Sequence, residues 1–220
     1  GAMCVNAGYA QNVIAIASSH FASAEKQFRN PLEYGNQRPV ASTWTVTGAG
    51  AYIVGDKPLD KKKCVLIKGI TTGKIVDYGV KDSMNMGACM APAAAELIEA
   101  NFKDLDVDKD YYDAIFTGDL GEIGNRILSE LLKEKGIDIA DKLYDCGMLI
   151  YEGETKCSGG SGCGCSAVVL GSCIMDRLTR GEYKRVLFVP TGALLSTVSY
   201  NEGKSVPGIA HGVILEGKES

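Results

Sequence analysis

Short apolar runs alternate along this chain with longer segments of helix-forming residues, and most of the runs lead into turns of glycine and other small residues. The apolar runs of strand length begin near Val13, Cys64, Tyr111, Lys184 and Ile209. Helix formers dominate residues 91–102, 123–135 and 167–180. This alternation is typical of an α/β protein in which helices cover a sheet. Ligands in such folds bind where the carboxyl ends of strands meet the turns, so we expect the site there.

Three segments carry more specific structural predictions. Residues 13–17 form a continuous apolar run, which is typical of a buried strand, and the polar Ser18, Ser19 and His20 end it. Residues 43–54 are rich in β-branched and aromatic side chains and predict one strand, in which glycines mark a bulge or a close approach of backbones. Residues 146–151 predict a further short strand.

Two helix starts are also predicted. Pro92 lies near the start of the helix expected over 91–102, where proline is tolerated. Asp119 stands between a predicted strand and a predicted helix, and we expect it to cap that helix.

Composition excludes several classes of protein. The formal net charge of −4 disfavours electrostatic binding of nucleic acid by the chain as a whole, because phosphate binding needs clustered positive charge. No apolar run approaches the roughly 20 residues that span a bilayer. The first residues lack the pattern of a signal peptide. We therefore expect a soluble intracellular protein without nucleic-acid partners.

Eight cysteines invite two interpretations that we set aside. Disulfides belong mainly to small secreted domains, whereas this chain has 45% hydrophobic residues and can build a core, so we expect reduced thiols. A structural zinc site needs paired ligands, but the chain has no CxxC pair and only two histidines. We expect no metal and no cofactor.

The beginning of the chain is unusual. Gly1-Ala2-Met3 is either native or the scar of a cleaved tag. An apolar run follows almost at once, without the strand and helix that usually open a domain, so we expect a fragment of a longer protein.

The glycine-rich stretch over residues 159–166 is the most specific local motif. Its glycines, among them Gly162 and Gly164, permit a close approach of a ligand, and the helix that follows offers N–H groups to an anion. The same small residues also suit tight packing of a helix with buried, inert cysteines. Cys163 and Cys165 are candidate nucleophiles at a helix start, but the nearest candidate base, His211, is distant in sequence.

A second cluster follows the first strand. Ser19 and His20 precede a basic segment that contains Lys26, Arg29 and Arg38. Arginine can bind a carboxylate with two hydrogen bonds, so the cluster suits an acidic ligand. The alternative is a solvated loop with ordinary surface charges.

Several segments together resemble the stage V sporulation protein AD family. They occur in order over nearly the whole chain: SSH (18–20), AEKQFR (24–29), EYG (33–35), TVTGAG (45–50), NMG (85–87), MAPAAA (90–95), TGDL (117–120), CGMLIY (146–151), GGSGCGCSA (159–167), TGALLS (191–196) and IAHG (209–212). The resemblance implies a thiolase-like α/β fold, a mixed sheet layered with helices. It places residues 1–55 as the end of the first half of that fold and residues 56–220 as the second half.

The same resemblance implies what the chain does. Members of the family are regarded as binders of dipicolinic acid, pyridine-2,6-dicarboxylate, which is taken up into the developing spore. The segment with a cysteine at the thiolase nucleophile position has no counterpart here, and Cys163 and its neighbours stand where thiolases have a histidine. We therefore expect no catalytic residue and a non-catalytic binding role. The alternatives are an acyl-CoA-dependent acyltransferase and a scaffold for membrane channel partners.

The expected ligand-binding residues combine both clusters. They are Ser19, His20, Arg29, Gly162, Cys163, Gly164 and Cys165. The expected partners are dipicolinic acid and other stage V sporulation proteins at the spore membrane, together with a second copy or the missing first half of the fold. The expected location is the cytoplasm or the periphery of the inner membrane of the developing spore.

Overall fold

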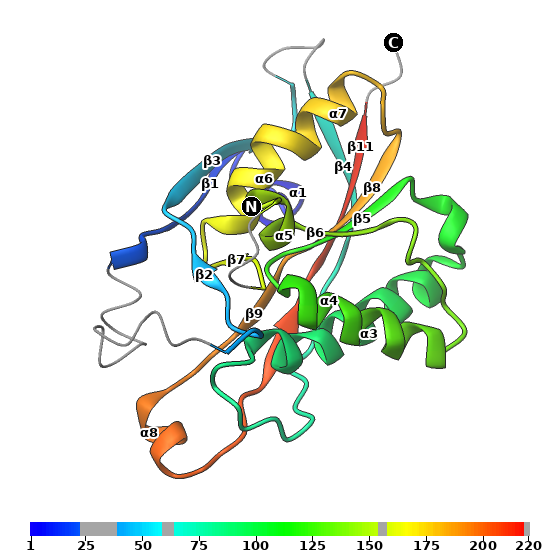
Figure 1. Cartoon of the computed structure of the whole chain (residues 1–220). Coiled ribbons are helices and arrows are strands. Elements are labelled where there is room, and N and C mark those ends of the chain that lie inside the picture. Colours follow the sequence, from blue (N-terminus) through cyan, green and yellow to red (C-terminus); the bar gives the residue numbers. More distant parts are fainter. Residues whose placement is uncertain (23–38, 59–63, 154–157, 218–220) are drawn as a thin grey trace.

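A five-stranded mixed sheet organises most of the chain (Figure 1). The computed structural model describes residues 1–22, 39–58, 64–153 and 158–217. The strand order is β4 (Val65–Thr71), β11 (Gly212–Gly217), β8 (Arg185–Val189), β5 (Ala114–Thr117) and β6 (Leu143–Asp145). Strands β8, β5 and β6 are parallel, and β11 is antiparallel to both of its neighbours. The α/β class expected from the sequence is confirmed.

Helices cover both faces of this sheet (Figure 1). Helices α3 (Met86–Leu105) and α4 (Gly121–Glu134) pack on one face. On the other face, α6 (Cys165–Val169), the π-helical segment η3 (Leu170–Ile174) and α7 (Met175–Thr179) form one continuous helix. Successive strand residues alternate between the two cores, as the pleat requires: Ile115 packs under α3 and α4, and Phe116 packs under α6 and η3.

A two-stranded antiparallel pair lies against the far side of α6. It consists of β1 (Asn12–Ser19) and β3 (Gly48–Gly55), in a regular register from Ser19 opposite Gly48 to Asn12 opposite Gly55. A Cβ atom at Gly48 would lie 2.7 Å from the Val168 side chain, and one at Gly50 would lie 2.9 Å from Ala167. The sequence predicted either a bulge or a close approach at these glycines. The structure shows a close approach of β3 to α6.

The remaining elements are short. They are α1 (Ala2–Asn6), β2 (Trp44–Thr45), η2 (Lys109–Tyr111), α5 (Cys146–Ile150), β7 (Gly160–Ser161), β9 (Thr191–Ala193), α8 (Thr197–Asn201) and β10 (Gly208–Ala210). Strands β2 and β7 pair in parallel, and β9 and β10 pair in antiparallel.

Three local predictions were wrong. Residues 43–54 form two strands, because β2 leaves to pair with β7 before β3 begins. Residues 146–151 are mainly helical: the Asp145 carboxylate accepts the Met148 N–H at 3.1 Å and starts α5. Helix α3 begins at Met86, where the Asn85 side chain caps it, so Pro92 lies inside the helix and not in its first turn.

The first strand was predicted correctly, but its burial was not. Ile14 and Ile16 on β1 are 63% and 69% exposed, and Ile53 on β3 is 59% exposed. Ile14 and Ile53 are register partners, so the exposed side chains gather on one surface of the pair. Helix α6 covers the opposite surface, and none of the described residues buries this one.

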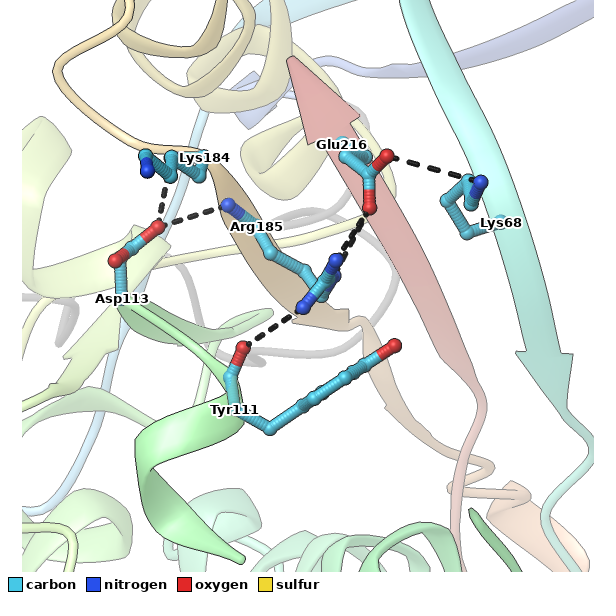
Figure 2. Close-up of polar contacts among 6 residues, drawn as sticks. All are labelled: Lys68, Tyr111, Asp113, Lys184, Arg185 and Glu216. Carbon is cyan, nitrogen blue, oxygen red and sulfur yellow. Dashed lines mark hydrogen bonds and ion pairs between the residues drawn. The ribbon is translucent and has the colours of Figure 1, made fainter. Parts of the chain in front are cut away.

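A polar cluster joins three segments at the amino-terminal end of β8 (Figure 2). The Arg185 guanidinium donates to Glu216 Oε2 on β11 at 2.7 Å and stacks 4.0 Å over the Tyr111 ring. Asp113 Oδ2 accepts the backbone N–H groups of Lys184 and Arg185 at 2.7 and 2.8 Å. The cluster therefore ties β8 to β11 and to the segment before β5, at the end opposite the turns that follow β5 and β8.

Over the described ranges, no helix combines the length and the apolar character that crossing a membrane would require.

Candidate functional site

A cavity of about 640 Å³ lies where the turns after β5 and β8 meet β1, α3 and the glycine-rich loop. Its wall is largely apolar, with Met86 and Met90 from α3, Leu170 from η3 and Phe188 from β8. Polar residues also line it, among them Asp119, Ser161 and Thr191. An apolar slot with a few convergent polar groups is the usual form of a small-molecule site.

The glycine-rich loop is held by hydrogen bonds from its backbone N–H groups to side chains on other segments. Gly162 has a φ of +102°, which favours glycine, and its N–H donates to Asp119 Oδ2 at 3.0 Å. The Gly164 N–H donates to Ser19 Oγ at 3.0 Å, and a Cβ atom there would lie 2.4 Å from the Gly48 carbonyl oxygen. Two N–H groups that the sequence offered to an anion are thus already taken by protein acceptors, while Gly162 itself still lines the cavity.

Asp119 connects three segments at the cavity wall. Its Oδ2 accepts the Gly162 N–H, and its Oδ1 accepts the Thr191 hydroxyl at 3.0 Å. Burial, followed by the nearby charge of Asp145, raises the pKa of the Asp119 carboxyl to about 6.

The expected capping role of Asp119 was wrong. The Asp145 carboxylate accepts the N–H groups of Leu120 and Gly121 at 2.9 and 3.0 Å, so Asp145 occupies the start of α4. Asp119 is instead free to face the cavity. Its place in the turn after a central parallel strand was the signal that could have identified it as a site residue.

The cysteines of the loop differ in environment. Cys165 is fully buried, and burial raises the pKa of its thiol well above the ordinary range. Its Sγ faces the Gly118 carbonyl oxygen at 3.9 Å. Cys163 is exposed and lines the cavity. Buried thiols with raised pKa values are poor nucleophiles, so Cys163 is the reactive candidate of the two.

The structure separates the two histidines from the cavity. His20 and His211 are both exposed, and neither is among the described residues that line the cavity. His211 Nδ1 instead accepts the Gly73 N–H at 3.1 Å. The geometry therefore assembles no Cys–His pair at the cavity wall from the described part of the chain.

The predicted binding residues that the structure describes take four kinds of position. Gly162 and Cys163 line the cavity, and Ser19 and Gly164 lie behind that wall, bonded to each other. Cys165 is buried beneath the loop. His20 lies outside the lining. Arg29 falls outside the described residues.

Tyr52 is a cavity residue that sequence reasoning missed. Its hydroxyl donates to the Ala167 carbonyl oxygen, and the Gly171 N–H bonds to the same hydroxyl. The hydroxyl thus stands between a carbonyl and an N–H four residues apart, which would bond to each other in a regular α-helix. Insertion of a side chain into the helical ladder is a known cause of distortion, and the π-helical segment begins at the adjacent Leu170. The strand pattern over residues 43–54 carries no signal for this contact.

In the ranges that the structure describes, no three or more His, Cys, Asp or Glu side chains gather in an arrangement that could hold an ion.

Comparison with known proteins identifies the family. Residues 1–216 match the sequence profile described as stage V sporulation protein AD (SpoVAD). The chain belongs to this family. The stage V sporulation protein AD of Bacillus subtilis (strain 168) is 46% identical over 213 residues. That alignment covers 96% of this chain and 62% of the relative, so the chain spans about three fifths of that protein's length.

Solved structures show the fold. A tetronic acid condensing enzyme, AbyA1, is similar with a TM-score of 0.57 at 15% identity, over 98% of this chain and 62% of that one. The 3-oxoacyl-[acyl-carrier-protein] synthase III of Aquifex aeolicus gives a TM-score of 0.52 at 13% identity, over 98% and 61%. The 3-oxoacyl-(acyl carrier protein) synthase III of Pseudomonas aeruginosa gives a TM-score of 0.53 at 8% identity, and the match covers 99% of this chain and 61% of that one. The chain therefore has a thiolase-like fold.

Proposed function

We propose that this chain supplies much of a dipicolinate-binding site in a protein of spore formation, and that binding, without acyl transfer, is its role. The observation that carries the proposal is the cavity, whose wall is largely apolar and includes a few polar groups. A flat pyridine ring suits the apolar wall, and its carboxylates need hydrogen-bond donors. We propose that the protein works at the inner membrane of the developing spore with other stage V proteins, as the family resemblance suggests.

The donors on the described wall are neutral. Ser161 and Ser166 line the cavity with hydroxyl groups, whereas the Thr191 hydroxyl already donates to Asp119. No lysine, arginine or histidine lines the cavity among the described residues. The basic segment that contains Arg29 joins described residues at both of its ends. Before it, Phe21 stacks on Trp44 with ring centroids 5.3 Å apart. After it, Ser42 lines the cavity. Arg29 itself lies outside the described residues, and we propose it from the sequence as a partner for a ligand carboxylate.

The cysteines support a binding role over catalysis. Nucleophilic acyl transfer needs an activated thiolate and a base. Cys165 is buried and its raised pKa opposes the thiolate, while the exposed Cys163 has no histidine beside it on the described wall.

Calorimetric titration tests the proposal directly. Dipicolinate is titrated into this chain and into the same chain joined to the amino-terminal part of the Bacillus subtilis relative. Binding by both forms would place the essential groups within these residues, and binding only by the joined form would mean that the site needs the other part as well. Binding by neither would overturn the proposal.

A charge deletion then tests the basic segment. Arg29→Ala removes one charge-assisted hydrogen bond and is expected to weaken dipicolinate binding about tenfold or more. Arg126→Ala on α4 is the matched control, because Arg126 is exposed and does not line the cavity. An unchanged affinity for Arg29→Ala would remove Arg29 from the site.

The apolar wall keeps acyl transfer as a second candidate. Met86, Met90 and Leu170 would suit an acyl chain as well as a ring. Incubation with acyl-CoA followed by mass spectrometry separates the two functions: an acyl group added to Cys163 would favour the enzyme, and an unmodified protein that binds dipicolinate would favour the binder.

A further inference from the structure

The wall that carries the donors of the cavity also carries a carboxyl group. Asp119 is partly buried and lines the cavity beside Ser161 and Thr191. Both of its hydrogen bonds come from neutral donors, the Gly162 N–H at 3.0 Å and the Thr191 hydroxyl at 3.0 Å. No ion pair joins Asp119 to a lysine, arginine or histidine in the part of the chain that the structure describes. A carboxylate ligand that enters would meet this group at close range.

The titratable groups around Asp119 come from several elements. Asp145 and Cys146 lie at the junction of β6 and α5, Cys165 begins α6, and Cys163 and Tyr52 line the same cavity. None of these carries a positive charge, and the Asp145 carboxylate adds like charge. Like charges in a site of low dielectric favour protonation of one partner.

The proton has a preferred place in this pair. Asp145 accepts four hydrogen bonds, from the Thr117 hydroxyl and from the N–H groups of Leu120, Gly121 and Met148, three of them at the starts of helices. Asp119 accepts two. Hydrogen bonds and helix starts stabilise the charged form, so Asp145 keeps its charge more readily and Asp119 accepts the proton.

We propose that Asp119 takes up one proton from solvent when a carboxylate ligand enters the cavity, and that it then holds the ligand as a neutral acid. The proton adds to a carboxylate oxygen of Asp119, and the resulting O–H donates to a ligand carboxylate oxygen. Each oxygen of Asp119 can keep its present bond, because each has a second lone pair. The inference rests on the proposed function, since it concerns the same cavity and the same class of ligand.

Proton uptake has a measurable signature. Dipicolinate is titrated into the protein near neutral pH in two buffers that differ in ionisation enthalpy, phosphate and Tris. The difference in observed heat gives the number of protons exchanged, and we expect an uptake close to one per ligand. Above the pKa of about 6, the affinity should fall by up to about tenfold per pH unit.

Asp119→Asn removes the titrating group and keeps the contacts. Its amide oxygen can accept the Gly162 N–H, and its amide nitrogen can donate to the Thr191 hydroxyl oxygen. We expect this variant to bind dipicolinate with no proton uptake and with a flat pH profile. Asp104→Asn, on the exposed surface at the far end of α3, is the control and should behave like the parent.

A neutral ligand of the same shape provides a second control that needs no variant. Pyridine-2,6-dicarboxamide should bind without proton uptake, since it carries no charge to oppose. Binding of dipicolinate with no buffer dependence, or with an unchanged uptake in Asp119→Asn, would overturn the role of Asp119 and leave the binding function standing. Failure of dipicolinate to bind in the chain and in the joined form would instead overturn the proposed function, and this inference with it.

Discussion

The hydroxyl of Ser19 at the end of β1 bonds to Gly164, which lies 145 residues later in the glycine-rich loop. Ser19 Oγ accepts the Gly164 N–H at 3.0 Å and donates to the Val46 carbonyl oxygen at 2.6 Å. One side chain thus satisfies an N–H at the start of α6 and a carbonyl between β2 and β3. The cavity wall formed by the loop is therefore fixed by the strand pair and not by the loop alone.

Removal of this hydroxyl should loosen the loop. Ser19→Ala leaves the Gly164 N–H and the Val46 carbonyl without this partner, and we expect a loss of about 1–3 kcal/mol in the free energy of unfolding. Urea unfolding measures it. Ser18→Ala is the matched control, because the neighbouring Ser18 is exposed, and it should change stability little. Equal effects of the two substitutions would contradict the bridging role.

The packing of the loop predicts a sharp difference between two glycines of the cavity region. A Cβ atom at Gly164 would lie 2.4 Å from the Gly48 carbonyl oxygen, whereas one at Gly192 meets nothing closer than 3.7 Å. Gly164→Ala should therefore cost about 1–3 kcal/mol by overpacking, and Gly192→Ala should be close to neutral. Thermal unfolding of both variants distinguishes them, and a tolerated Gly164→Ala would show that the loop can move away from β3.

The hydroxyl of Tyr52 should maintain the π-helical segment η3 in the continuous helix formed by α6, η3 and α7. Tyr52→Phe removes the group that stands between Ala167 and Gly171, so we expect the local π-helical turn to relax toward a regular α-helix. Because a backbone bond can replace the lost ones, the expected cost is only about 1 kcal/mol.

Hydrogen exchange at the Gly171 amide, followed with Tyr9→Phe as the exposed control, reports this change. We expect an altered exchange rate in Tyr52→Phe and none in the control, since Tyr9 is 85% exposed. An unchanged rate at Gly171 would mean that the distortion has another cause.

The extent to which sequence predicted the structure depends on the range of the interactions. Local signals predicted correctly those elements whose secondary structure depends mainly on their own residues. The apolar run near Val13 forms β1, and the helix formers over 123–135 form most of α4. Local signals gave wrong predictions where contacts with other parts of the chain, or their absence, determine the structure or the burial of a segment. Residues 146–151 became helical because Asp145 caps them, and Ile16 is exposed because no described residue covers its surface.

The candidate site was predicted in part for the same reason. Gly162 and Cys163 were found because glycine density is a local signal, and both line the cavity. The bridge made by Ser19 was not foreseen, although Ser19 itself was selected. Asp119 and Tyr52 act through partners that lie far away in sequence, Thr191 and Ala167, and periodicity cannot show such contacts.

The cluster at the start of β8 predicts that arginine cannot be replaced by lysine there (Figure 2). The planar guanidinium of Arg185 stacks 4.0 Å over the Tyr111 ring while it bonds to Glu216. Lysine offers a point charge and cannot do both. We expect Arg185→Lys to cost about 1–2 kcal/mol in urea unfolding. Arg180→Lys, in an exposed pair with Asp176, should cost less than about 0.5 kcal/mol, and equal losses would contradict the stacking argument.

The carboxyl of Asp119 predicts how stability depends on pH even without a ligand. Burial raises its pKa in the folded chain from 3.8 to about 6. Between these two values the folded state binds more protons than the unfolded state, so this group makes the free energy of unfolding fall as pH rises from about 4 to about 6. The full contribution is present below the unfolded pKa and is lost above the folded one, up to about 3 kcal/mol.

Comparison of the parent chain with Asp119→Asn across this pH range isolates the contribution. We expect the variant to gain stability relative to the parent as pH rises, and Asp104→Asn to follow the parent throughout. The carbon-13 shift of the Asp119 carboxyl gives a direct reading of the same titration, with a midpoint near 6. A midpoint in the ordinary aspartate range, with parallel pH profiles for parent and variant, would show that the charged form of Asp119 is already stabilised in the folded chain and would contradict its role as a proton acceptor.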